Sequence, residues 1–166
     1  MRLRAAAFLV PVLVAAGVAA GSAAAGSTTS SAGRSITMHL VEKQIGFNFI
    51  DNPPRQGFNA PPLMGDQFVF TSELQTRTGA HVGFLDATCM ITRGGVHGTG
   101  TCYGTFRLKG GQLAGIAGID FSGNGPDHIA VVGGTGAYDG VKGSITSVSR
   151  GENSPFTDDT IKLVYP

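Results

Sequence analysis

The sequence predicts an all-β protein, an eight-stranded antiparallel β-barrel that forms one domain over residues 35–166. Three observations predict this fold. Apolar and polar residues alternate with a period of two over most of the region. Turn residues divide it into short segments, and no stretch has the spacing of an amphipathic helix. Glycine is frequent, at 26 of 166 residues, and Trp is absent, which suits a tightly turned β-chain.

The expected strands are bounded by Gly, Pro, Asn and Asp. In chain order they are Ile36–Glu42, Gln67–Thr76, Val82–Thr92, Thr99–Leu108, Gln112–Phe121, His128–Val132, Val141–Ser149 and Thr160–Tyr165. The second strand alternates clearly, because Phe68, Phe70, Ser72 and Leu74 point the same way. The sixth is a nearly continuous apolar run. Eight antiparallel strands can close into a barrel that is filled by side chains or holds one small ligand, and closure removes exposed edges.

Short turns are expected between most strands, with one exception. Gly110-Gly111 separates the fourth strand from the fifth, and Gly133–Gly140 separates the sixth from the seventh. The exception is Gln44–Asp66, which is long for a structureless connection in a compact domain. Its phenylalanines are expected to cover apolar surface, either a barrel mouth or a subunit contact. A packed Ω-loop without such a role is the alternative.

The first 25 residues predict a secretory signal peptide. Met1–Arg4 is a basic start, an apolar run extends from Ala5 to Ala20, and Ala23–Ala25 offers a cleavage site. The apolar run is short for a membrane span and Pro11 interrupts it, so a retained anchor is disfavoured. Residues 26–34 form a Ser/Thr/Gly leader that is expected to be flexible. The mature protein is therefore predicted to be secreted, with no membrane association after cleavage.

The predicted mature chain has almost no net charge. Without Arg2 and Arg4, ten of the twelve Lys and Arg residues remain, against eleven Asp and Glu. A charge near minus one argues against nucleic acid or an anionic membrane as partner, because both are bound through positive patches.

The two cysteines are expected to form a disulfide, which is the usual state in an exported protein. Cys89 and Cys102 are placed symmetrically about the turn-forming stretch Arg93–Gly98, so a hairpin puts them directly opposite each other. Closing so short a loop contributes on the order of 3 kcal/mol in the chain-entropy model. The bridge also identifies the inner face of this hairpin, which carries Leu85, Ala87, Cys89, Ile91, Cys102, Gly104, Phe106 and Leu108.

Several enzyme classes lack support in the sequence. Val132–Gly136 resembles a dinucleotide-binding turn, but the residues that follow alternate like a strand instead of forming a helix. Its glycines are expected to allow positive φ and close backbone approach in a hairpin. The four histidines show no metal-ligand spacing, so no metal site and no cofactor are predicted. There is no G-x-S-x-G signature of a hydrolase.

Four carboxylates on the expected strands are candidates for acids inside the barrel, namely Glu42, Glu73, Asp86 and Asp120. Alternation places Glu73 outside and Asp86 opposite the cysteine face. Asp120 lies between apolar and glycine neighbours, where burial would raise its pKa. Glu42 ends the first strand. A solvated charge is the simpler interpretation of each of them.

A family resemblance rests on three groups of residues: Gly65-Asp66 with Phe70-Thr71, Val82-Gly83 with Cys89, and Ala130–Gly136 with Gly140-Val141 and Gly143. With these the chain resembles allene oxide cyclase-like barrels, and plant dirigent proteins are similar through the same glycine-rich segment. The resemblance implies an eight-stranded barrel with an apolar cavity, often a homotrimer. Cyclases of this type close a reactive fatty-acid epoxide, and dirigent proteins orient phenoxy radicals for stereoselective coupling.

The resemblance also implies site residues, with departures from the cyclase pattern. The cavity cysteine of the cyclase falls on Cys89, which is expected to be in the disulfide, and the cyclase asparagine is Ser72 here. The cavity tyrosine of the cyclase falls near Asp120, and its first-strand glutamate corresponds to Glu42. These departures argue against a plant-type allene oxide cyclase. For a dirigent-like role, an acid at Asp120 or Asp86 would matter more than a thiol.

The sequence therefore predicts a secreted barrel that binds an apolar small molecule. If it is an enzyme, it is an isomerase or cyclase that holds a reactive substrate in one conformation, assisted by one acid. Glu42, Ser72 and Asp120 are the candidate catalytic residues. The candidate ligand-binding residues are Phe68, Phe70, Leu85, Phe106, Ile119 and Phe121. The alternatives are a non-catalytic binding or scaffold protein with a filled barrel and a protein that assembles through its outer surface.

Overall fold

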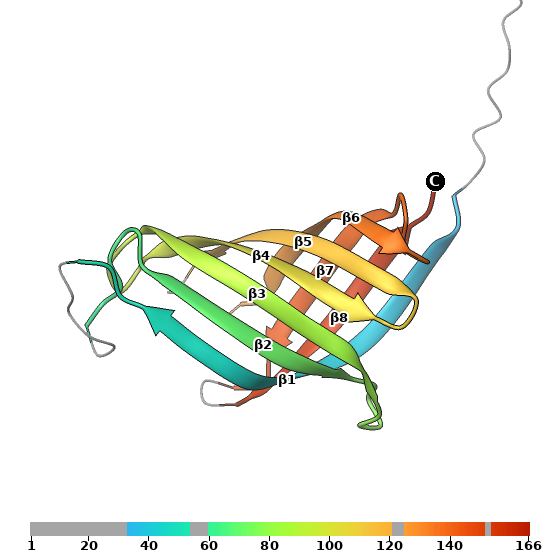
Figure 1. Ribbon diagram of the computed structural model, residues 1–166, viewed down its shortest axis with the longest axis horizontal. Coiled ribbons are helices and arrows are strands. Elements are labelled where there is room, and N and C mark those ends of the chain that lie inside the picture. Colours follow the sequence, from blue (N-terminus) through green and yellow to red (C-terminus); the bar gives the residue numbers. More distant parts are fainter. Residues whose placement is uncertain (1–32, 54–59, 121–124, 152–153) are drawn as a thin grey trace, which may run out of the picture. The chain divides into compact units, whose positions relative to one another are not determined.

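A computed structural model describes residues 33–53, 60–120, 125–151 and 154–166, and these form a closed antiparallel barrel of eight strands (Figure 1). The strands are β1 Ser35–Ile50, β2 Gln67–Gln75, β3 His81–Arg93, β4 Thr99–Leu108, β5 Gly111–Asp120, β6 Asp127–Gly136, β7 Lys142–Ser149 and β8 Phe156–Val164. Each pairs with the next, and β8 pairs with β1 from Ser35↔Val164 to Lys43↔Phe156. The predicted fold class is confirmed. The described residues contain no helix that is long and apolar enough to cross a membrane. The predicted signal peptide, most of the leader and Phe121 lie outside the described residues.

The disulfide and the faces that it identifies are confirmed. Cys89 and Cys102 are directly opposite in the β3–β4 register and are bonded, with their Cα atoms 4.0 Å apart. The same register pairs Leu85 with Phe106, and both side chains are buried. Alternation thus places the next residues along each strand on the outer face of the barrel.

The predicted connection at Gln44–Asp66 is wrong in its first third. β1 continues to Ile50, and Gly46–Ile50 pair with Gln67–Thr71 of β2. The register shifts between Gln44 and Gly46, so Ile45 is a bulge residue. A bulge reverses the alternation of side chains and so hides the strand from a period-two search. Phe47, expected to cover a barrel mouth or a subunit contact, lines the cavity described below; Phe58 lies outside the described residues.

Two other strands are longer than predicted. β6 runs to Gly136 rather than ending at Val132, because a second register shift lets Gly133–Gly136 pair with Gly111–Ala114 of β5. β8 begins at Phe156 rather than Thr160. The glycines between β6 and β7 make the predicted hairpin, since φ is +62° at Gly136 and +71° at Gly140. No described residue after Gly136 is helical, so the structure lacks the helix that a dinucleotide turn requires.

One end of the barrel interior is filled. Ten buried side chains form a single apolar plug, to which each of the eight strands gives one or two residues and the β6–β7 turn gives Val141. The plug comprises Leu40, Leu74, Leu85, Phe106, Leu113, Val131, Val141, Ile145, Ile161 and Leu163. Burying ten such side chains supplies the main stabilisation of a domain of this size.

The other end is open on one side. The β1–β8 pairing ends at Lys43↔Phe156, and the β5–β6 pairing ends at Ile116↔Ala130. β1 to β4 run past the ends of β7 and β8 (Figure 1). The described strands therefore enclose the filled end completely, while the hollow end is walled mainly by β1 to β5.

Candidate functional site

A cavity of about 830 Å³ lies in the hollow half of the barrel, beside the plug. This volume falls in the range of small-molecule sites. Five of the six predicted ligand-binding residues line it, namely Phe68, Phe70, Leu85, Phe106 and Ile119. The interior is thus partly filled and partly hollow. The sequence left open a barrel filled by side chains and a barrel with a ligand cavity, and the structure has a filled part and a hollow part.

An aromatic wall forms one side of the cavity. Phe47 of β1 and Phe68 of β2 are stacked with ring centroids 5.9 Å apart. Phe70 continues the series, with its ring centroid 6.4 Å from that of Phe68. Three neighbouring rings give the cavity a large apolar contact surface.

The cavity exists because small residues lie level with Phe70 on the next three strands. The register places Ala87, Gly104 and Gly115 in one row on β3, β4 and β5. A Cβ on Gly115 would lie 2.7 Å from Cγ2 of Ile129, and one on Gly104 would lie 3.1 Å from Cδ1 of Leu85. Larger residues in this row would extend the plug into the cavity.

Two carboxyl groups mark the boundary between plug and cavity. Glu42 of β1 is 8% exposed and lines the cavity, and Asp159 of β8 is 1% exposed. Asp159 is directly opposite Leu40, two residues before Glu42, so both carboxyls belong to the same inner face of adjacent strands. Cross-strand diagonal neighbours are within reach of each other when their side chains are long.

Two serines accompany the acids. Ser147 of β7 is opposite Asp159 and donates a hydrogen bond of 2.5 Å from Oγ to Asp159 Oδ1. Ser72 of β2, which is 1% exposed, also lines the cavity and hydrogen-bonds Glu42. Among the described residues, Asp159 Oδ2 is the one buried side-chain oxygen or nitrogen with no conventional hydrogen-bond donor. A proton on Glu42 would supply that donor.

Burial makes Glu42 the proton-holding member of the pair. Desolvation raises the pKa of Glu42 well above its ordinary value, and the charge and hydrogen bond of Asp159 raise it further, while Ser72 opposes this. The pKa of Asp159 is also raised by burial, but the hydrogen bonds from Glu42 and Ser147 lower it in part. Two adjacent buried carboxyls avoid carrying two charges by sharing one proton.

The predicted catalytic residues are only partly brought together. Glu42 and Ser72 lie on neighbouring strands at the cavity floor. Asp120 lines the cavity at the far end of β5, where its side chain is exposed, so the burial considered for it is not found. Asp86 is on the outer face, as alternation predicted, and forms an ion pair of 2.6 Å with Arg107.

Asp159 and Ser147 were not recognised from the sequence. The signal was present, because Asp159, Ile161 and Leu163 alternate on one face of β8, and all three are buried. Starting the last strand at Thr160 left Asp159 outside it. Asp127 also lines the cavity, at its rim; desolvation raises its pKa, and the adjacent His128 lowers it to a smaller extent.

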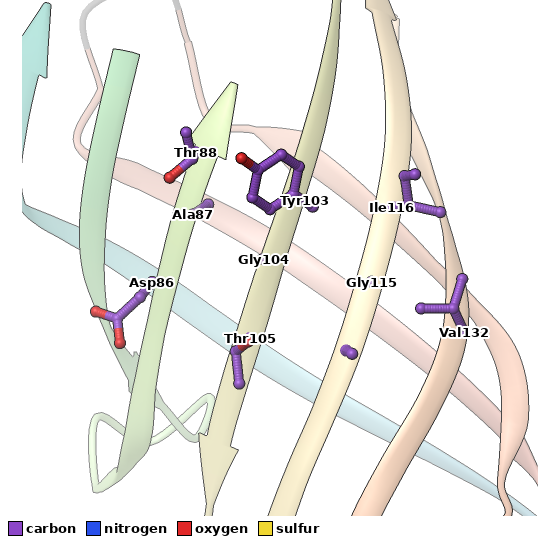
Figure 2. A pocket seen from close by; sticks show the side chains of 10 residues that line it. Asp86, Ala87, Thr88, Tyr103, Gly104, Thr105, Gly115, Ile116 and Val132 are labelled. Atoms are coloured by element: carbon purple, nitrogen blue, oxygen red, sulfur yellow. The ribbon is translucent and has the colours of Figure 1, made fainter. Parts of the chain in front are cut away.

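A second hollow, of about 430 Å³, lies on the outer face of β3 to β6. Figure 2 shows Asp86, Thr88, Tyr103, Thr105, Ile116 and Val132 around it. Tyr103, Ile116 and Val132 are 59%, 43% and 64% exposed. Ala87, Gly104 and Gly115 border this hollow and the inner cavity alike, so only the backbone of the sheet separates the two there.

No protein-family model and no curated protein matches the chain. Solved structures do. A pyocyanin demethylase is similar over 77% of this chain and 99% of its own, with 26% sequence identity and a TM-score of 0.64. The pterocarpan synthase dirigent protein PsPTS1 is similar over 80% and 96%, with 15% identity and a TM-score of 0.65. The Diels-Alderase AbmU from Streptomyces koyangensis is similar over 82% and 71%, with 16% identity and a TM-score of 0.60. The predicted resemblance to dirigent-type barrels is thus confirmed at the level of the fold.

Proposed function

We propose that this protein binds one apolar small molecule in the barrel cavity and that Glu42 exchanges a proton with it. The observation that carries the proposal is a buried carboxyl, beside a second buried carboxyl, on the floor of a cavity of about 830 Å³, where burial raises the pKa of Glu42. A carboxylic acid that keeps its proton at neutral pH can act as a general acid, which an exposed glutamate cannot do efficiently.

Each group at the floor has a distinct part in this proposal. Glu42 faces the ligand and is the catalytic acid. Asp159 lies behind it and accepts its proton in a hydrogen bond, so it is a positioning residue. Ser147 orients Asp159, and Ser72 hydrogen-bonds Glu42. When Glu42 gives its proton to the ligand, Ser72 stabilises the carboxylate that remains.

The reaction class follows from what the cavity supplies. Its apolar walls hold a substrate in one conformation, and positioning of this kind lowers the barrier to cyclisation or coupling. The structural neighbours include a Diels-Alderase, a dirigent protein and a demethylase by name, so this barrel form serves several reactions on small molecules. Cyclisation or stereoselective coupling of an apolar substrate, assisted by Glu42, is the activity that we propose.

The test uses native mass spectrometry of the purified protein after incubation with an extract of the producing culture. We expect one small molecule to be retained or converted by the wild type. Glu42→Gln should still bind but convert it at least tenfold more slowly, because one general acid contributes about 10²–10⁴-fold. Glu73→Gln, a matched change on the outer face, should behave as wild type. Equal conversion by Glu42→Gln would overturn the acid role, and retention of no molecule would overturn the binding site.

A non-catalytic binding protein is the second candidate. The plug and the exposed rim position of Asp120 favour it, because they leave a single buried acid pair rather than a ring of catalytic groups. Under this candidate the extract molecule is retained unchanged by the wild type, with Glu42→Gln altering its affinity only.

We further propose that the protein is exported and assembles as a homotrimer. Export is supported by the basic start, apolar run and small-residue cleavage site of the first 25 residues and by the disulfide. Assembly is supported by the family resemblance and by the exposed side chains of Tyr103, Ile116 and Val132 around the outer hollow. Amino-terminal sequencing of the protein from culture medium tests the first. Light scattering of wild type and Ile116→Asp tests the second, with a trimer expected for the former and a monomer for the latter.

A further inference from the structure

The cavity has a marked charge bias. Its acidic lining residues, among those that the structure describes, are Glu42, Asp120 and Asp127, and no Lys, Arg or His of the described residues lines it. Asp159 lies directly behind Glu42. A ligand that enters this space meets acidic groups at the rim and at the floor.

The negative charge at the floor is incompletely compensated. One proton shared between Glu42 and Asp159 leaves one negative charge in a place where both side chains are more than nine-tenths buried. Ser147 donates to Asp159 Oδ1, whereas Oδ2 has no donor among the described residues other than a proton on Glu42. A buried charge with so few partners is costly, and a positive charge on a bound molecule would offset that cost.

The aromatic wall favours the same sign of charge. Phe47, Phe68 and Phe70 line the cavity beside the acids. Aromatic rings attract cations through their negative faces, most strongly where water is excluded. The described lining offers no positive charge to an anionic group, and the carboxyls would repel one, so a bound carboxylate would meet like charges without a compensating cation.

We propose that the cavity selects a cationic ligand, or a neutral base that becomes cationic by taking the Glu42 proton, and that it rejects a carboxylate of the same shape. In the second case the proton leaves the Glu42 carboxyl and bonds to the lone pair of the base, which gives a protonated ligand facing two carboxylates. No oxidant or reductant is involved. The proposal rests on the proposed function in taking the inner cavity as the binding site and, for a neutral base, in taking Glu42 as the proton donor.

Three flat tricyclic probes of nearly equal size separate charge from shape. They are 10-methylacridinium, a permanent cation; acridine, a neutral base; and anthracene-9-carboxylate, an anion. Each is titrated into the full mature protein at neutral pH and followed by its own fluorescence. We expect the cation to bind tightest and the anion weakest, with affinities that differ by on the order of tenfold or more, because a buried charge pair is little screened.

Variants show whether the preference comes from the floor. The double variant Glu42→Gln with Asp159→Asn removes the charge at nearly constant shape and should bring the three affinities within about threefold, as expected when the charge contribution is lost. Glu73→Gln, on the outer face, should keep the wild-type order. Circular dichroism confirms that each variant is folded.

The outcomes separate this inference from the proposed function. Equal binding of all three probes by the wild type leaves the cavity as a binding site and overturns charge selection. An unchanged preference in the double variant overturns the role of the Glu42–Asp159 pair. Binding of none of the probes contradicts the charge selection, whereas retention of a molecule from the culture extract would still support the cavity as a binding site.

Discussion

Glu42 and Asp159 are diagonal neighbours on the adjacent strands β1 and β8, and both carboxyl groups are buried at the base of the barrel cavity. They are only 8% and 1% exposed. On one side of the pair is an apolar plug, and on the other is the space for a ligand. An acid in this position is shielded from bulk water but faces the cavity, which is the arrangement that general acid catalysis requires.

The raised pKa of Glu42 predicts a stability that falls as pH rises. Below its ordinary value of 4.5, the carboxyl is protonated in the folded and unfolded states alike and makes no difference. Above that value the unfolded chain loses the proton while the folded protein keeps it, so the folded state is disfavoured relative to the unfolded state. Glu42→Gln cannot ionise. As the pH rises from acidic to neutral, the melting temperature of Glu42→Gln should therefore increase relative to that of the wild type.

The control for this titration is Glu73→Gln. Glu73 is on the outer face, paired with Phe84, and its side chain reaches His81 at 3.2 Å. Melting temperatures of the three proteins are measured across the pH series by circular dichroism. Parallel curves for wild type and Glu42→Gln would contradict a protonated Glu42.

The disulfide predicts a large loss of stability on its removal. Cys89 and Cys102 are 13 residues apart in sequence and join β3 to β4 at the cavity wall. Replacing both by Ser should lower the free energy of unfolding by about 3 kcal/mol, because the unfolded chain regains the entropy of the closed loop. Denaturant titration measures this, and wild type treated with a reductant should lose a similar amount. A loss below about 1 kcal/mol would show that the strand pairing alone holds the hairpin.

Two glycines on β5 predict opposite outcomes for the same substitution. Gly115→Ala places a methyl group 2.7 Å from Ile129 Cγ2 on the inner face, and overpacking of this kind costs about 1–3 kcal/mol. Gly118→Ala meets nothing within 4 Å and should be neutral or slightly stabilising. Thermal unfolding of the two variants gives the comparison. Equal destabilisation would mean that Gly115 is not held against β6.

Substitutions at two adjacent residues of β5 can show which of the two hollows binds the ligand. Ala117 lines the inner cavity and is 7% exposed, whereas Ile116 borders the outer hollow and is 43% exposed. Ala117→Leu should weaken ligand binding at least tenfold, because the larger side chain occupies part of the cavity volume that the ligand needs. Ile116→Ala should leave it unchanged. Isothermal titration with 10-methylacridinium measures both, and the reverse pattern would place the ligand on the outer face.

The strands with unbroken alternation could be predicted from the sequence. The symmetric positions of Cys89 and Cys102 about their turn set the register of β3 and β4, and the structure has that register. β1 and β6 were predicted too short because each contains a register shift, at Ile45 and at Val132. A bulge moves later side chains to the opposite face, so a search for period two ends there.

The candidate site was predictable only in part, because it depends on how distant strands are aligned. Glu42 was found through the family resemblance, but its partner Asp159 lies 117 positions later and meets it only through the β1–β8 pairing. The cavity likewise depends on the alignment of residues from several strands. It requires Ala87, Gly104 and Gly115 to lie level with Phe70, and no single strand shows this.

The protonation state of Glu42 is the most direct test of the account. Infrared difference spectroscopy at neutral pH reports the carbonyl stretch of a protonated carboxyl separately from the bands of a carboxylate. We predict such a band in the wild type, its loss in Glu42→Gln and its persistence in Glu73→Gln. A wild-type spectrum without a protonated carboxyl, or a band that survives in Glu42→Gln, would contradict the claim that Glu42 is the acid of this cavity.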